Sequence, residues 1–189
     1  MRRLAAVPAA LVLLLAGCGG GSDPAPSADP SPSAESSDPS ASAAPAWNPC
    51  DGLRVARIEA ALGERLRKDS GTPDAPRCAL VPRTEGGAVL DANYLVFPEG
   101  LDAAWEQMGA PDDGSATEPD VPGADDARLV AGTSEDGALT VTGFVQNGAV
   151  VQVVNAVDPA PYDRRAVLAA VRESMAQLSA YAGRGGAPS

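Results

Sequence analysis

Residues 138–157 read ALTVTGFVQNGAVVQVVNAV, and they carry the clearest structural pattern in the chain. Apolar residues alternate with other residues on both sides of Asn147-Gly148, which is typical of two β-strands joined by a tight turn. Asn-Gly supplies the two positive-φ residues of a type I′ turn, whose twist matches that of the flanking strands. A two-residue loop at this dipeptide predicts the following cross-strand neighbours: Val145 with Val150, Phe144 with Val151, and Val141 with Val154.

The predicted hairpin has one apolar face and one mixed face, because successive side chains of a strand point to opposite sides. We expect the apolar face to enter the core, and it consists of Leu139, Val141, Val145, Val150 and Val154. The mixed face carries Thr140, Thr142, Phe144, Val151, Val153 and Asn155. On that face, Phe144, Val151 and Val153 need a cover, or they line a groove for an apolar ligand or partner.

The elements around the hairpin are read from the same periodicities. Helical spacing of apolar residues predicts helices over residues 54–67, 101–108 and 162–181, with Asp163 as the N-cap of the last one. Strand-like runs cover residues 78–83, 89–97, 127–133, 138–146 and 149–157. This order predicts an α+β fold: a single domain with a twisted antiparallel sheet of about five strands and helices packed on it.

The N-terminus is typical of an exported protein. Two arginines precede an apolar stretch at residues 4–16, which is shorter than the roughly 20 residues a membrane span needs and suits a signal peptide. The stretch ends in Leu15-Ala16-Gly17-Cys18, which resembles the bacterial lipobox. The resemblance implies that residues 1–17 are removed and that Cys18 carries the lipid (diacylglyceryl and further acyl groups such as palmitate). The alternative is an ordinary secretory signal in which the cysteine stands by chance.

Composition divides the remaining chain into a tether, a domain and a tail. Residues 18–46 are rich in Pro, Ser and Ala and lack large apolar side chains, so we expect a disordered tether with a reach of about 85 Å. Residues 47–182 have the size and periodicity of one α+β domain, and residues 183–189 form a disordered tail. The Ala/Pro/Ser usage and the scarcity of Lys favour a high-GC genome, as in actinobacteria.

Two cysteines remain for the domain, Cys50 and Cys78. In an oxidising compartment such a pair predicts a structural disulfide, which would tie the start of the first helix to the first strand. A metal site is the weaker alternative, because it needs more thiols or a histidine, and the chain has no histidine. A redox-active pair normally has Cys-x-x-Cys spacing, and these two residues lie far apart.

Several short motifs are similar to those of the DUF3558 group of actinobacterial lipoproteins, an uncharacterised family. The motifs are Asn48-Pro49-Cys50, a predicted helix ending Ala61-Leu62-Gly63, a second cysteine opening a strand at Cys78, and residues 121–127. Position 125 holds Asp where the family usually has Gly. The resemblance implies a location and a fold more than an activity.

Charge and residue content exclude several classes of function. The chain carries 14 Lys and Arg against 25 Asp and Glu, a net charge of −11, so nucleic acid is not expected as a partner. Without histidine, Ser-His-Asp and Cys-His catalysis are impossible. Ser-Lys chemistry would depend on Lys68, the single lysine, which lies in a polar segment. We expect no enzyme and no cofactor, with a carboxylate-based hydrolase as the remaining catalytic alternative.

Residues 111–126 are expected to form a long acidic loop. Its carboxylates are those of Asp112, Asp113, Glu118, Asp120, Asp125 and Asp126. Calcium binding needs oxygens at fixed offsets, a pattern that this proline-containing loop lacks, so a solvated loop without metal is the expectation and calcium the alternative.

These observations together predict a lipoprotein on the outer face of the cytoplasmic membrane. Its domain would act as a binding or interaction module for an unknown cell-envelope protein, and membrane lipid would be its partner through the anchor. The alternative is a carrier or sensor of a small apolar or envelope-derived ligand. A carrier requires a cavity between sheet and helix.

Overall fold

The computed structural model describes residues 47–109 and 115–185. The chain divides into two units, residues 1–40 and 41–189, and every described residue belongs to the second. The predicted signal peptide, Cys18 and the tether therefore lie outside the described residues, and so do residues 186–189 of the tail.

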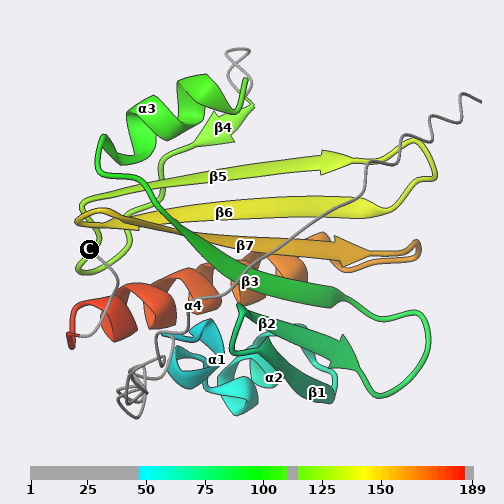
Figure 1. The fold of residues 1–189 in the computed structure, drawn as a ribbon. Coiled ribbons are helices and arrows are strands. Elements are labelled where there is room, and N and C mark those ends of the chain that lie inside the picture. Colours follow the sequence, from blue (N-terminus) through cyan, green and yellow to red (C-terminus); the bar gives the residue numbers. More distant parts are fainter. Residues whose placement is uncertain (1–46, 110–114, 186–189) are drawn as a thin grey trace, which may run out of the picture. The chain divides into compact units, whose positions relative to one another are not determined.

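The described residues form one antiparallel sheet with helices on both faces, which confirms the predicted α+β class (Figure 1). The strands, in sheet order, are β1 (Leu66–Thr72), β2 (Ala75–Pro82), β3 (Val89–Val96), β7 (Val150–Asp158), β6 (Leu139–Asn147), β5 (Asp126–Thr133) and β4 (Ala116–Thr117). The helices are α1 (Pro49–Gly52), α2 (Val55–Leu62), α3 (Gly100–Gln107) and α4 (Arg164–Ala182). The sheet has seven strands rather than about five, because β1 and β4 add an edge on each side.

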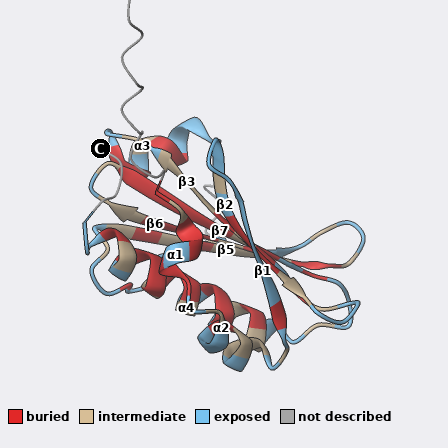
Figure 2. Ribbon diagram, turned by 60° about the horizontal axis from the view of Figure 1, so that its bottom comes forward, coloured by how far each residue is buried: buried red, intermediate tan, exposed pale blue. Residues whose placement is uncertain are grey.

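The main core lies on the sheet face that carries α4, which we call the back face (Figure 2). The predicted apolar face of the hairpin is buried there, with Leu139, Val141 and Val145 no more than 1% exposed. Helix and sheet approach closely at Gly143, where an added Cβ would lie 2.6 Å from the Met175 sulfur atom. Since close packing of this kind excludes voids, the back-face core is filled by its own side chains.

The register of the hairpin differs from the prediction by two residues. Asn147 pairs with Val150, so the loop residues are Gly148 and Ala149 rather than Asn147 and Gly148. Gly148 still provides a positive φ of 59°, which a tight hairpin turn needs at its first position. Because side chains alternate with period two, a shift of two residues changes every predicted cross-strand pair but moves no side chain to the other face.

The first predicted helix is too long at its C-terminal end. Helix α2 stops at Leu62, because Gly63 takes the left-handed conformation (φ 78°) and its N–H bonds to the Glu59 carbonyl. The chain then enters β1, in which Leu66 is buried and the next six residues are exposed. Leu62 and Leu66 are four residues apart, which imitates helical spacing although they belong to different elements. Because β1 has only one buried residue, its sequence shows no alternation that would have indicated a strand.

Helix α4 follows the prediction at its start and along its buried side. Asp163 caps it by accepting hydrogen bonds from the backbone N–H groups of Arg165 and Ala166. Met175 and Leu178 are fully buried against the sheet. The helix is therefore fixed by its cap and by its apolar stripe, and its opposite side faces away from the core.

Candidate interaction surface

The sheet face opposite α4, which we call the front face, is ordered in rows that cross four strands. The rows follow from the register of β3, β7, β6 and β5. Their members, in that strand order, are Val89, Val157, Thr140 and Gly132 in row one; Asp91, Asn155, Thr142 and Val130 in row two; Asn93, Val153, Phe144 and Arg128 in row three; and Leu95, Val151, Gln146 and Asp126 in row four. The rows lie at successive positions along the strands, and they differ in whether a helix covers them.

Helix α3 covers rows three and four. Trp105 packs edge-on against Phe144, with ring centroids 5.3 Å apart, and Leu101 is fully buried beside it. The three residues that sequence analysis proposed as a groove, Phe144, Val151 and Val153, are between 0% and 9% exposed in this cluster. Their side chains therefore pack against the protein's own helix.

Polar contacts hold α3 in this position. The Gln146 side chain accepts a hydrogen bond of 2.7 Å from the Leu101 N–H at the start of the helix. Arg128 forms ion pairs with Asp102 of α3 and with Asp126 of its own strand, and its guanidinium lies 5.2 Å from the Trp105 ring centroid. Both contacts arise from front-face positions of β5 and β6, so the sheet itself orients its cover.

No helix of the described residues 47–109 and 115–185 lies over rows one and two. Val89 and Val157 lie opposite each other on β3 and β7, the third and fourth of seven strands, and are 40% and 45% exposed. Because the two side chains are direct cross-strand neighbours, they form one contiguous apolar area on this face. We call Val89, Asp91, Thr140, Thr142, Asn155 and Val157 the open patch.

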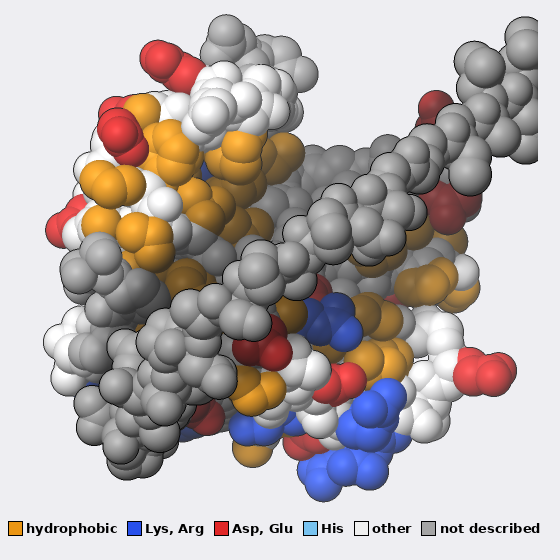
Figure 3. Space-filling model, viewed as in Figure 1, with side chains coloured by type: hydrophobic (Ala, Val, Ile, Leu, Met, Phe, Trp, Pro, Cys, Tyr) orange, Lys and Arg blue, Asp and Glu red, His pale blue; other side chains and the backbone are white. Residues whose placement is uncertain are grey.

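Three polar members of the open patch form hydrogen bonds or ion pairs. Thr142 donates a 3.0 Å hydrogen bond to the Asn155 side chain, and Arg77 on β2 forms an ion pair of 3.6 Å with Asp91. Figure 3 views this face: hydrophobic side chains gather over α3 at the upper left, and Lys and Arg side chains lie near the β1–β2 edge at the lower right. The hydrogen bond and the ion pair therefore fix the positions of Thr142, Asn155 and Asp91 on this face.

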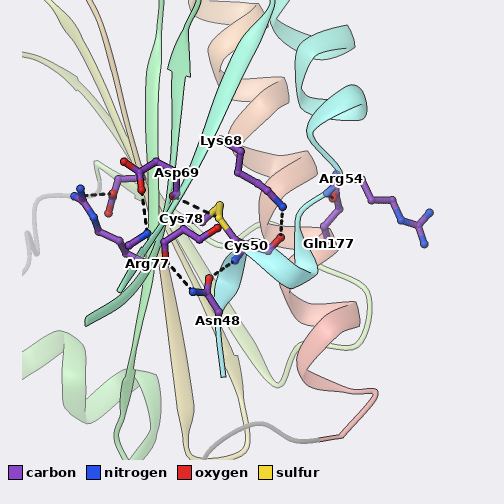
Figure 4. Close-up of a disulfide and its surroundings, with 11 residues drawn as sticks. Asn48, Cys50, Arg54, Lys68, Asp69, Arg77, Cys78 and Gln177 are labelled. Carbon is purple, nitrogen blue, oxygen red and sulfur yellow. Dashed lines mark hydrogen bonds and ion pairs between the residues drawn. A yellow bond between two sulfur atoms is a disulfide. The ribbon is translucent and has the colours of Figure 1, made fainter. Parts of the chain in front are cut away.

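The two cysteines of the domain form the predicted disulfide, which joins α1 to β2 (Figure 4). Their Cα atoms are 4.8 Å apart, and both residues are at least 98% buried. Asn48 caps α1 through the Cys50 N–H, and Lys68 donates a hydrogen bond of 3.3 Å to the Cys50 carbonyl. Lys68 is exposed, and its side chain makes this structural contact. The disulfide spans a sequence separation of 28 residues, and closing a loop of this length stabilises the fold by about 3.5 kcal/mol.

The acidic loop is only partly described, since Asp112 and Asp113 lie outside the described residues. Asp125 accepts a hydrogen bond from the Gly148 N–H, and Asp126 is engaged by Arg128. Among residues 47–109 and 115–185, no three His, Cys, Asp or Glu side chains converge as metal ligands would. Asp125 and Asp126 therefore have structural contacts, whereas Glu118 and Asp120 are exposed.

Sequence analysis missed the basic side of α4. Arg164, Arg165 and Arg172 are exposed and line one hollow together with Leu168 and Ala169. The signal was present, because α4 carries three arginines and one glutamate in a chain of net charge −11. It was hidden by the overall acidity, which says nothing about how charges are distributed over a folded surface.

None of the helices in the described residues is both long enough and apolar enough to span a membrane. Comparison of the chain with family models, with curated proteins and with solved structures finds no match. The similarity to DUF3558 lipoproteins therefore stays a prediction from the motifs around Cys50 and Cys78.

Proposed function

We propose that this chain is a lipid-anchored binding module of the cell envelope that recognises a partner protein through the open patch. The observation that carries the proposal is the exposed Val89–Val157 pair, which lies at the ends of the third and fourth strands on the same face that α3 covers further along. Exposed aliphatic side chains on ordered strands are typical of protein-binding surfaces. Val89 and Val157 would supply the apolar centre, and Asp91, Asn155 and Thr142 the polar rim.

The close packing around Gly143 and Phe144 favours recognition at the surface over a ligand enclosed within either core. An enclosed ligand site typically has a volume of about 300–1,000 Å³ and needs space between sheet and helix. At Gly143 the back face has no room even for one methyl group beside Met175 and Val171. On the front face, Trp105 and Leu101 fill the space over Phe144.

The anchoring part of the proposal depends on Cys18 and on the Pro/Ser/Ala-rich residues that follow it. The Leu-Ala-Gly-Cys motif at residues 15–18 supports lipidation, and the Cys50–Cys78 disulfide supports an oxidising, extracytoplasmic compartment. Two or three acyl chains hold a protein durably on a membrane, since each buried methylene contributes about 0.8 kcal/mol. The domain would then present the open patch to partners at the outer face of the cytoplasmic membrane.

Site-specific photo-cross-linking in intact cells tests the binding surface. A photoreactive amino acid at position 157 should give an adduct of one defined mass, because this side chain lies inside the open patch. The matched control is position 96, since Val96 is on the adjacent strand β3, is 41% exposed and belongs to the other side of the sheet. Equal adducts from both positions would contradict the proposal.

A charged side chain in the patch should prevent partner binding and therefore the cross-link from position 157. Val89→Lys introduces a cation beside position 157 and should abolish the cross-link, whereas Val96→Lys should leave it unchanged. For the anchor, Cys18→Ser should move the protein from the membrane fraction to the medium. Retention of that variant in the membrane would refute lipidation at Cys18 while leaving the cross-linking result intact.

A further inference from the structure

Helix α4 presents a basic, partly apolar hollow on the side away from the core. Its volume is about 390 Å³, and it is lined by Arg164, Arg165, Leu168, Ala169 and Arg172. Arg164, Leu168 and Arg172 follow one another at intervals of four residues, so they form a single stripe about 12 Å long on the helix. The stripe therefore places an apolar side chain between two cations.

A second hollow continues this stripe toward the sheet. It measures about 150 Å³ and shares Arg164, Leu168 and Arg172 with the first. Helix α4 packs on β6 and β7, which leaves the back side of the neighbouring strand β5 beside the helix. There, Leu129 and Ala131 extend the apolar floor, and the lining ends at Thr117 of β4 and at Ser115.

The three guanidinium groups have no ion pair or hydrogen bond with any side chain in the described part of the chain. Nearby carboxylates have other roles: Glu173, the one acidic residue of α4, forms an ion pair with Arg57, and Asp163 caps the helix. Three unpaired cations in one hollow are unusual in a chain of net charge −11. Their charge is therefore available to a ligand.

We infer that these two hollows bind an anionic amphiphile, a molecule with one phosphate-type head group joined to an apolar chain. Guanidinium groups bind phosphate oxygens through paired, charge-assisted hydrogen bonds, which explains the arginine rim. The floor of Leu168, Leu129 and Ala131 removes the first part of an apolar chain from water. A free phosphate ion would bind the arginines but would leave the apolar floor in contact with water.

This site is separate from the open patch, because α4 lies on the back face and the patch on the front face. The membrane that the proposed anchor enters is one source of anionic amphiphiles. The inference concerns a single bound molecule, however, and it stands or falls independently of a protein partner at Val157.

Native mass spectrometry on the full protein, purified as the cell makes it in an uncharged maltoside detergent, tests the inference. The probes are dioctanoyl phosphatidylglycerol, dioctanoyl phosphatidylcholine and glycerol phosphate. We expect one retained molecule of phosphatidylglycerol, with an affinity at least about tenfold higher than that of either other probe, because only this probe has both the net anionic head group and the chain. Equal binding of phosphatidylcholine, or of glycerol phosphate alone, would overturn the inference.

The double variant Arg164→Gln/Arg172→Gln should lower the phosphatidylglycerol affinity by about tenfold or more, since both cations shared by the two hollows are removed. The control is Arg54→Gln/Arg67→Gln, which removes the same charge from two exposed arginines elsewhere on the surface. An equal loss in both variants would mean that only net charge matters and would overturn the site. Thermal unfolding of each variant verifies that both remain folded, and Arg165→Gln provides a single-charge variant of the same hollow.

Discussion

Rows one and two of the front face differ from rows three and four, although the same four strands build all of them. Where α3 lies over the sheet, the central positions are Phe144 and Val153, and they are buried. One row further along the same strands, the equivalent positions are Thr142 and Asn155, which are hydrogen-bonded to each other and partly exposed. At the central positions of β6 and β7, residue type therefore follows the cover, except that Val157 and its neighbour Val89 are apolar and exposed at the uncovered end.

The largest expected change in the free energy of unfolding follows from removing the cover of rows three and four. Trp105→Ala should lower the free energy of unfolding by about 3–5 kcal/mol, because it deletes a buried indole that packs on Phe144. Urea unfolding followed by circular dichroism measures this. A loss comparable to that of an exposed residue would mean that α3 contributes little and that the two halves do not differ.

Weakening the attachment of α3 should have a smaller effect. Arg128→Met removes the ion pairs to Asp102 and Asp126 and the contact with the Trp105 ring while keeping an aliphatic stem. We expect a loss of about 1 kcal/mol, because the partners are partly exposed and such pairs are weak in water. Amide hydrogen exchange should rise in α3 and stay unchanged in α4. Equal rises in both helices would contradict a local role.

The end of β7 adds a pH-dependent effect beside the open patch. Burial raises the pKa of Asp158, and the charges of Glu64 and Asp163 raise it further. Because the folded state then binds the proton more tightly than the unfolded state, stability falls as pH rises through these pKa values. Asp158→Asn should therefore raise Tm at about pH 7 and have no effect at about pH 3. The exposed Asp120→Asn is the control, and a Tm gain that is equal at both pH values would disprove the assignment.

The smallest expected effect lies in row one. Val157→Ala should change the free energy of unfolding by less than about 0.5 kcal/mol, since this side chain is 45% exposed and no helix covers it. The same urea titration as for Trp105→Ala gives the number on one scale. A loss near 2 kcal/mol would show that row one is a part of the core and would remove the basis for the open patch.

The fold class and most elements follow from local patterns in the sequence. The period of two along residues 138–157 placed the hydrophobic side chains that it assigned, such as Val141 and Phe144, on the correct faces, although the predicted cross-strand pairs differ from the actual register by two residues. The disulfide followed from the even cysteine pair, and the cap at Asp163 from helix chemistry. Such signals depend on neighbours in the chain, which a sequence displays directly.

The remaining features depend on contacts between distant segments. Strand β1 has one buried residue, Leu66, so it carries no alternation, and β4 has two residues only. The cover of Phe144 by Trp105 joins residues 39 positions apart, which no spacing within the hairpin encodes. The arginine hollow likewise needs α4 to lie beside β5 before Arg172 and Leu129 line the same space.

The disulfide has a mechanical consequence for the N-terminal end of the domain. Tension along the chain reaches the fold at Trp47, whose ring stacks on Tyr181 and touches Tyr94 edge-on. Three residues later, Cys50 is bonded covalently to Cys78 in β2, the neighbour of the central strand β3. A pull on the N-terminus is therefore transmitted through a covalent bond into the interior of the sheet, so α1 cannot peel away first.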